Sequence, residues 1–367
     1  MAKSNILAPK LLIRGFEVFV AISLVGFGSV LIYTGTWRTF LGSLGDIHWQ
    51  WILVGIGLAS MDWIGGGLRL WVVARQVTPN PPLKGMILAG GMSAWAAYLT
   101  PLQSGAAPMM IYTMKRYGVP VPVAMTSTLM TFIATVAFFA IAGPLAILAG
   151  AGRSLGDKGD VLGLSLYDLF IGSLTIFAGI GVVLVFVIFF PRLARDLLHW
   201  ITGHLGNRSD RLSSRLEKLR AGIDQAHESI LKFNTPKGWL SLFWCTVLSA
   251  PSHANKLLAG YVALRAVGIH AQFVDVLLVQ TLIMFLLYFA PTPGASGVAE
   301  VTSALVMSVY LPKELVPLYT LIWRAILSYF TLAFGGLVFY SWLRKGATDL
   351  EEDTAETAAA AVAETGG

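Results

Sequence analysis

Ionisable side chains occur inside apolar stretches of this chain that are long enough to cross a bilayer. Glu300 and Arg324 are two of them, and Asp62 and Arg69 lie two helical turns apart on one face of an expected helix. A charge at the bilayer centre costs roughly 2.5–3.5 kcal/mol on insertion scales, so each is a candidate functional site. Because a carboxylate beside a guanidinium removes two such penalties, we predict that Glu300 and Arg324 pair. The pair either contacts a polar substrate or only fixes helix packing.

Further polar side chains extend this group. His253, Asn255 and Lys256 share one apolar stretch, and Gln280 lies in the next. Arg69 and Lys256 could instead extend along the helix to reach an interface. The ionisable residues that we predict to bind substrate are Glu300, Arg324, Asp62, Arg69 and His253.

A break rich in proline and glycine occurs twice. Thr100–Pro108 reads TPLQSGAAP and Ala290–Gly297 reads APTPGASG, and each ends an apolar segment. Such a break frees backbone N–H and C=O groups that hydrocarbon cannot bond, so it survives only where it is buried in protein or lines a polar cavity. Paired breaks in corresponding positions of two halves are the best indication in a sequence of a transporter binding site.

Residues of both breaks are therefore further candidates for substrate binding. Each break is followed by a short apolar stretch and a second turn, at Tyr117–Pro120 and Tyr310–Pro312. The alternative is that these residues only let helices pack closely, since Gly and Pro are common in membrane helices. The candidates at the breaks are Pro101, Gln103, Gly105, Pro293, Gly294 and Gly297.

Composition indicates a polytopic membrane protein. Of 367 residues, 56% are hydrophobic and 13% are charged, and the mean hydropathy is +0.70. The formal net charge of +6 does not suggest nucleic acid, because the basic residues lie in loops, where they set topology and meet anionic lipid. Cys245 is the single cysteine, which excludes an intrachain disulfide.

Sequence motifs give little support for an enzymatic function. The chain has no G-x-x-x-x-G-K-[ST] or H-E-x-x-H motif. Its six histidines are scattered without the spacing of a zinc site. We expect no enzymatic activity, no cofactor and no metal. An intramembrane transferase that uses Asp62 or Glu300 as a base is the alternative.

The apolar pattern predicts an all-α membrane protein with six full spans and two broken, re-entrant segments. The N-terminal run follows Lys3, Lys10 and Arg14, and we interpret it as an uncleaved first span. The full spans are expected near 17–35, 51–75, 120–149, 167–190, 238–262 and 317–343, and the broken segments at 85–116 and 272–310.

Basic residues predict the orientation. Loop 191–237 carries nine Lys and Arg residues, so it is expected in the cytoplasm. Both termini then also lie inside the cell, and the loops at 36–50 and 150–166 lie outside. The protein is thus expected in the inner, cytoplasmic membrane.

This topology predicts an inverted repeat. One unit begins with an outside-to-inside span and the other with an inside-to-outside span, which places both breaks near the midplane. The basic amphipathic helices expected in the cytoplasmic loop either lie on anionic lipid or pack on the bundle. The expected organisation is an N-terminal tail and first span (1–50), repeat unit 1 (51–149), a linking span (150–190), the cytoplasmic helices (191–237), repeat unit 2 (238–345) and a disordered acidic tail (346–367).

The second break also carries a family resemblance. Pro291–Glu300, followed by Trp323-Arg324 and then Gly335-Gly336, resembles the flippase-like family, the transmembrane domain of lysylphosphatidylglycerol synthases. Pro101–Gly118 is similar to the first motif of that family. The resemblance covers roughly 12–343 and implies a stand-alone member without the soluble aminoacyl transferase domain.

Departures from the family pattern limit what the resemblance implies. The first motif of the family reads Pro-X-Arg-X-Gly-Glu, whereas this chain has Gln103 and Ala106 at the charged positions. The second motif has Ala295 where glycine is usual. The resemblance therefore carries over Glu300 and Arg324, but not the charged pair of the first half.

Together these features predict a transporter that moves a lipid or lipid-linked molecule between leaflets. The expected partner is membrane lipid, either an anionic phospholipid or a lipid-linked headgroup, and an oligomer or a lipid-modifying enzyme is a further candidate. The alternatives are a non-transporting partner subunit of a lipid- or glycan-modifying enzyme and a carrier of soluble substrates. A lipid substrate predicts a cavity that opens sideways to the bilayer.

The predicted topology can be tested by single-cysteine labelling in a Cys245→Ser background. A cysteine at Ser213, in the loop expected to be cytoplasmic, should react with a membrane-permeant reagent and stay protected from an impermeant one in intact cells. A cysteine introduced in 150–166 should show the opposite pattern. Labelling of Ser213→Cys from outside would contradict both the topology and the inversion of the repeat.

Overall fold

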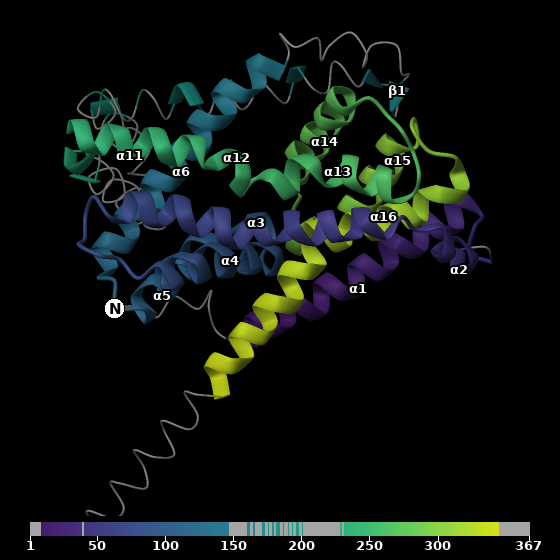
Figure 1. The fold of residues 1–367 in the computed structure, drawn as a ribbon, viewed down its shortest axis with the longest axis horizontal. Coiled ribbons are helices and arrows are strands. Elements are labelled where there is room, and N and C mark those ends of the chain that lie inside the picture. The colour runs from purple at the N-terminus through teal and green to yellow at the C-terminus, as the bar shows by residue number, and fades with distance from the viewer. Residues whose placement is uncertain are drawn as a thin grey trace, which may run out of the picture.

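The computed structural model is a bundle of helices (Figure 1). It describes residues 9–38, 40–146, 231–288 and 290–344, with scattered positions between 160 and 229. The expected span 167–190, the outer loop 150–166 and the helices of 191–237 lie mostly outside the described residues, and the tail 346–367 lies wholly outside them. A two-stranded hairpin pairs β1 (Asp160–Val161) with β2 (Leu164–Ser165).

The first half of the chain follows the predicted order. Proline or glycine follows several of its helix ends, and the break in the segment near 85–116 is confirmed. Long helices cover the stretches near 17–35 and 51–75 and the described part of 120–149. Its elements are α1 (Pro9–Thr34), α2 (Phe40–Ser43), η2 (Leu44–Asp46), α3 (Trp49–Ala74), α4 (Leu83–Leu99), η3 (Pro101–Gln103), α5 (Ala106–Arg116) and α6 (Val121–Ala146).

The second half contains the second break. The expected interruption of 272–310 is confirmed, since η6 separates two helices there. The elements are α11 (Pro236–Val247), α12 (Ser249–Ser252), α13 (Ala254–Ala266), α14 (Phe273–Tyr288), η6 (Pro293–Ala295), α15 (Val298–Met307), η7 (Lys313–Leu315), α16 (Val316–Arg324) and the π-turn η8 (Ala325–Tyr329).

One predicted span is wrong in detail. Residues 238–262 were expected to form one straight helix, but the chain forms α11, α12 and α13 in succession. Pro251 has no N–H to donate and disfavours a helical conformation in the residue before it. Ser249 Oγ donates to the carbonyl of Cys245 at 2.9 Å, and Nδ1 of His253 lies 2.9 Å from the carbonyl of Ser249. These side chains bond the backbone where the helix is interrupted.

Four helices among the described residues are long and apolar enough to cross a bilayer, and α14 is apolar but shorter. The last of the four is continuous from α16 through the π-turn to Arg344 and is called the terminal helix (Lys313–Arg344) below. The chain is therefore a polytopic, all-helical membrane protein. The four long helices are Pro9–Thr34, Trp49–Ala74, Val121–Ala142 and Lys313–Arg344.

Helix α3 runs through the middle of the molecule (Figure 1). It packs against α4 on one side and against α11, α12 and α13 on the other. Glycines allow the α3–α4 contact, because a methyl group added at Gly90 would lie 2.7 Å from the backbone nitrogen of Gly67. Helix α12 approaches α3 just as closely, at Gly65, where a methyl group would lie 2.9 Å from Ser252 Cα.

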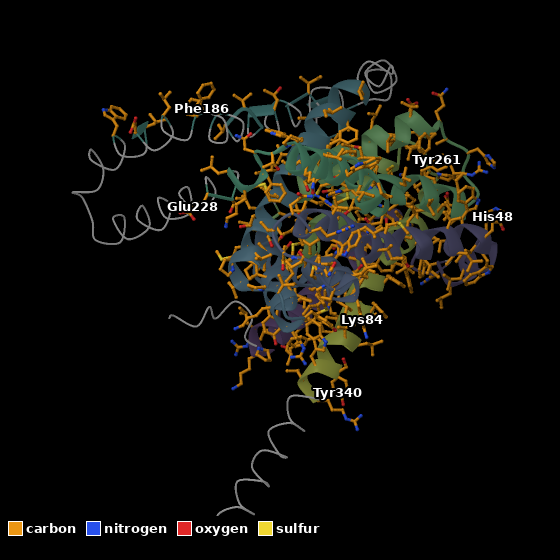
Figure 2. The ribbon with its side chains drawn as sticks, turned by 60° about the vertical axis from the view of Figure 1, so that its left-hand side comes forward. His48, Lys84, Phe186, Glu228, Tyr261 and Tyr340 are labelled. Carbon is orange, nitrogen blue, oxygen red and sulfur yellow. The ribbon has the colours of Figure 1, made fainter. Side chains whose placement is uncertain are left out.

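Several helix ends gather at one end of the molecule. Trp71 Nε1 donates to the carbonyl of Pro81 at 3.1 Å, which joins the end of α3 to the start of α4. The guanidinium carbon of Arg116 lies 5.1 Å from the ring centroid of Trp342, which joins α5 to the terminal helix. Figure 2 shows Lys84 and Tyr340 in the lower part of the molecule, well apart from His48.

The close α3–α4 contact predicts an asymmetry between two glycines. Gly90→Ala should force these helices apart and destabilise the protein by about 1–3 kcal/mol, as overpacking does. Gly57→Ala on α3, where an added methyl group meets no atom within 4 Å, should be neutral or stabilising by up to about 1 kcal/mol. Thermal unfolding in detergent measures both. Equal melting temperatures for the two variants would contradict the packing argument.

Candidate functional site

The two helix breaks meet inside the protein. Elements η3 and η6 contact each other, and α4 contacts both. They share a left-handed conformation at two positions, because Leu102 and Gln103 in the first break and Gly294 and Ala295 in the second have φ between 51° and 56°. Three of these four left-handed residues are not glycine, so the conformation is strained and the surrounding structure must hold it. The matching sequences are Pro101-Leu102-Gln103-Ser104-Gly105 and Pro293-Gly294-Ala295-Ser296-Gly297.

Each break bonds the N–H of its last glycine to a side chain. In the first break Thr100 Oγ1 accepts from the N–H of Gly105 at 2.8 Å and donates to the carbonyl of Ala96 at 2.8 Å. In the second, the carboxylate of Glu300 reaches back to the N–H of Gly297 at 2.7 Å. This contact places a negative charge at the N-terminus of α15, where it is favourable.

The predicted ion pair is present. Nε of Arg324 donates to Oε1 of Glu300 at 2.9 Å, and the side chains are 1% and 0% exposed. Both carboxylate oxygens are therefore engaged at short distance, one by Arg324 and one by the N–H of Gly297. The pair ties the start of α15 to the terminal helix.

The outer nitrogens of the guanidinium are held less firmly. Nη1 and Nη2 of Arg324 each lie 3.4 Å from the carbonyl oxygen of Gly294, and Nη2 lies 3.5 Å from Oγ of Ser23. Well-formed N–H···O bonds span 2.7–3.2 Å, so these contacts are weak. Glu300 thus positions Arg324, while the outer edge of the guanidinium keeps donor capacity.

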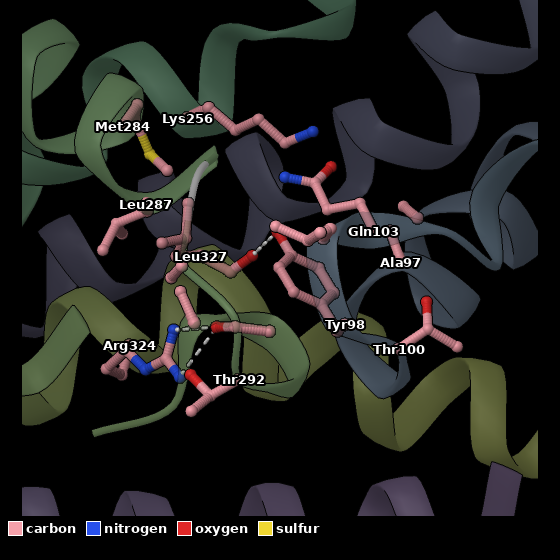
Figure 3. Close-up of a pocket in the computed structure, with 15 residues that line it drawn as sticks. Ala97, Tyr98, Thr100, Gln103, Lys256, Met284, Leu287, Thr292, Arg324 and Leu327 are labelled. Carbon is pink, nitrogen blue, oxygen red and sulfur yellow. Dashed lines mark hydrogen bonds between the residues drawn. The ribbon is translucent and has the colours of Figure 1, made fainter. Parts of the chain in front are cut away.

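A small cavity lies beside the guanidinium, between the two breaks (Figure 3). Its volume of about 40 Å³ gives room for roughly three water molecules. Lys256 and Gln103 reach into one side of it and Arg324 into the other. Among the described residues that line it, none is a carboxylate, and two are cations. Its polar lining consists of Thr100, Gln103, Lys256, Thr292, Arg324 and Tyr98.

Gln280 fixes the helices that carry both cations. Its amide donates to the carbonyl of Lys256 at 2.8 Å and accepts from the indole N–H of Trp323 at 3.0 Å. Gln280 is fully buried, and it links α13, α14 and α16. The polar group in this apolar helix therefore positions the backbone of Lys256 and of the residue before Arg324.

Tyr98 connects the two halves across the cavity. Its hydroxyl donates to the carbonyl of Leu327 at 2.6 Å (Figure 3). Leu327 lies in the π-turn, a local widening that is frequent at functional sites and releases carbonyls from the usual helical pattern. One neutral hydrogen bond thus joins α4 to the terminal helix beside Arg324.

The other ionisable candidates lie apart from the cavity. Asp62 accepts a hydrogen bond from Nδ2 of Asn255 at 2.8 Å, which joins α3 to α13. His253 bonds its own helix turn and packs against the rings of Phe138 and Phe139. Their expected role in substrate binding stays a prediction, because the structure does not bring them to the two breaks.

Arg69 forms a separate buried cluster. It donates to the carbonyl of Thr131 at 2.6 Å and to the hydroxyl of Thr135, and its Nη1 lies 3.4 Å from Oγ of Ser252. The side chain is 4% exposed, so the alternative that Arg69 extends to an interface is wrong. Lys256, which shared that alternative, lines the cavity instead.

The polar groups that sequence reasoning missed are hydroxyls. Ser23 on α1 approaches Arg324, Tyr98 bridges the halves, and Thr100 caps the first break. A Thr-Pro pair opens both breaks, at Thr100-Pro101 and Thr292-Pro293. That repetition was the available signal for Thr100, although Thr292 donates to the carbonyl of Ser296 and does not bond the N–H of Gly297. Ser23 and Tyr98 had none, because single hydroxyls are common in membrane helices.

The geometry predicts that Glu300→Gln is strongly destabilising. The amide offers one acceptor where the carboxylate serves two donors, so Arg324 or the N–H of Gly297 is left facing an N–H group. Breaking one partner of a buried pair costs about 3–5 kcal/mol. The double variant Glu300→Gln with Arg324→Leu should regain stability, since the amide oxygen can then serve Gly297 alone. Thermal unfolding tests this, and a double variant as unstable as Glu300→Gln would contradict it.

Comparison with known proteins places this architecture in a family. Residues 17–335 match the family described as the lysylphosphatidylglycerol synthase TM region. A UPF0104 membrane protein of Archaeoglobus fulgidus is 23% identical over 306 residues, which cover 81% of this chain and 88% of that protein. No solved structure matches the chain. The chain therefore belongs to the family of lysylphosphatidylglycerol synthase transmembrane regions.

Proposed function

We propose that this protein moves a lipid or lipid-linked molecule between the leaflets of the cytoplasmic membrane, without catalysing a reaction. The headgroup passes between the two helix breaks while the acyl chains stay in the bilayer. The observation that carries this proposal is the cavity at the junction of the breaks. Arg324 presents a guanidinium there whose outer nitrogens make only contacts of 3.4 Å or more.

The charges at the cavity favour an anionic headgroup. Lys256 and Arg324 line it with Gln103, and the carboxylate of Glu300 is already engaged by two donors. A phosphate oxygen could replace the weakly held carbonyl of Gly294 at the guanidinium. Charge-assisted bonds to phosphate are shorter and roughly twice as strong as neutral ones, so this exchange is favourable.

The proposal includes alternating access by an inverted repeat of 51–149 and 238–345. It is supported by the matching Pro-X-X-Ser-Gly breaks and by the same order of helix, break, short helix and Tyr/Pro turn in both units. A cavity of about 40 Å³ is too small for a headgroup. In this proposal the structure is therefore a closed state, and the breaks must separate to admit substrate.

The contacts between the breaks suggest where they separate. Glu300 and Arg324 both belong to the second unit, so they can move together and keep their ion pair. Beside the breaks, Tyr98 of the first unit donates a neutral hydrogen bond to the carbonyl of Leu327 of the second unit. Such a bond contributes about 0.5–1.5 kcal/mol, against about 3–5 kcal/mol for breaking a buried pair. Opening between η3 and η6 is therefore the less costly movement.

Activity of the double variant tests this assignment. Glu300→Gln with Arg324→Leu should fold but lose at least about tenfold in lipid translocation, since a headgroup contact worth about 1.4 kcal/mol or more is removed. The measurement is translocation of a fluorescent anionic phospholipid in proteoliposomes, normalised to folded protein.

Arg69→Leu is the matched control, because it removes a guanidinium of similar burial that faces Thr131 and not the cavity. It should keep most of the activity of the folded protein. Full translocation by the double variant would show that the Glu300–Arg324 pair only holds helices together. Loss of translocation in Arg69→Leu alone would place the headgroup path near Asp62 and Arg69 instead.

A further inference from the structure

A long apolar groove runs between α1 and the terminal helix. It consists of two joined depressions of about 370 and 380 Å³, which share Phe16, Leu332 and Ala333. Along α1 it extends from Ile13 to Phe27, which is about 21 Å at 1.5 Å per residue. One leaflet takes up half of the roughly 30 Å hydrocarbon core, so the groove is longer than one leaflet is deep.

The first depression of the groove lies against Arg324. Phe19, Ser23 and Tyr329 line the groove, and the same residues surround the guanidinium from the lipid side. The guanidinium carbon lies 5.2 Å from the ring centroid of Phe19 and 5.9 Å from that of Tyr329, while Nη2 approaches Ser23. The two rings meet edge to face, with centroids 6.2 Å apart. One layer of side chains therefore separates the groove from the cation that lines the cavity.

The other end of the groove lies where α1 begins and the terminal helix ends. Ile13, Tyr340 and Leu343 line it there, and Lys10 and Arg14 are exposed on the same end of α1. Figure 2 shows Tyr340 in the lower part of the molecule, where the terminal helix ends. Basic side chains at this end of α1, at the expected depth of the headgroups, suit a membrane lipid with an anionic headgroup.

Helix α1 itself covers both breaks. A methyl group added at Gly15 would collide with the carbonyl of Leu99, and one at Gly26 would lie 2.8 Å from Cα of Gly297. Phe19, between them on the same face, lies against Gly294. This helix lies outside both repeat units, and it stands between the groove and the two breaks.

We propose that the groove between α1 and the terminal helix binds an acyl chain of an anionic diacyl phospholipid and guides its headgroup to Arg324 between Phe19 and Tyr329. This inference rests on the proposed function and deepens it, because it names the substrate class and the side from which the substrate enters. The headgroup starts at Lys10 and Arg14, the chain slides along the groove, and the carbonyl of Gly294 gives way at the guanidinium.

Photo-crosslinking tests the groove without relying on transport. The protein is reconstituted in phosphatidylcholine vesicles that contain a trace of phosphatidylglycerol with a photoreactive group in one acyl chain. Crosslinks should concentrate in peptides of α1 and the terminal helix. The same probe with a phosphatidylcholine headgroup should label these peptides several-fold less, because it has no net negative charge for the guanidinium of Arg324 to attract.

Two matched substitutions locate the binding. Gly336→Phe places a ring in the groove, and the position has open space around it, with no atom within 4 Å of an added Cβ. It should reduce labelling by about tenfold, since displacing even two methylenes of a bound chain has that effect. Gly57→Phe, at an equally open position on α3, should leave labelling unchanged. Ala333→Phe, where the two depressions join, is the second variant if Gly336→Phe does not fold.

The outcomes separate the groove from the proposed function. Labelling spread over all lipid-facing helices, or unchanged in the groove-filling variants, would reveal annular contact only and overturn the inference, even if the protein translocates lipid. Selective labelling that Gly336→Phe abolishes would establish the groove, even if translocation by the parent protein fails. In that case only the proposed lipid translocation would be contradicted, and the binding of lipid in the groove would stand.

Discussion

Backbone polar groups cannot be left bare in hydrocarbon, and this constraint organises the centre of the molecule. Two helices break at Pro-X-X-Ser-Gly sequences, and each break recruits one side chain to its last glycine, Thr100 in the first and Glu300 in the second. The breaks then pack on each other and shield one another from lipid. Helix α1 seals the assembly, and it comes close enough only because Gly15 and Gly26 carry no side chain.

A carboxylate serves the last glycine of the second break, where a hydroxyl serves that of the first, and the buried carboxylate is paired with a cation. Glu300 therefore accounts for the buried charge of Arg324, and the guanidinium of Arg324 lines the cavity. A guanidinium has five donors in a fixed plane, and one carboxylate oxygen uses only a part of them. The remaining donors find a carbonyl and a hydroxyl at 3.4–3.5 Å. The Nη1 and Nη2 groups of Arg324 thus keep the capacity to donate hydrogen bonds to a ligand. The Glu300–Arg324 pair can therefore both hold the helices together and take part in the proposed binding.

Helix breaks and helix ends, which depend on nearby residues, could be predicted from the sequence. Side-chain contacts between helices that are distant in the sequence could not. Proline and glycine act on their own backbone, so both breaks and most helix ends fell near the expected residues. The kinks around Pro251 were missed because a single proline in an apolar run is compatible with a straight span. Asp62 and Arg69 share a helix face, but Asn255 and Thr131 from other helices decide that they form two clusters. Such partners have no signature in one sequence.

The same contacts say how the proposed transporter would move. Helix α3 packs closely on α12 and α13, where Gly65 lies against Ser252 and Asp62 is bonded to Asn255. Separating these helices would expose a buried carboxylate and backbone in tight contact, which is costly. Beside the breaks, Tyr98 of α4 donates a neutral hydrogen bond to the carbonyl of Leu327 in the terminal helix. A rocking motion should therefore pivot on the α3–α13 contact and open at the breaks. In that motion Asp62 serves as a pivot, and the opening lies beside the groove that faces the bilayer, which suits a lipid better than a soluble substrate.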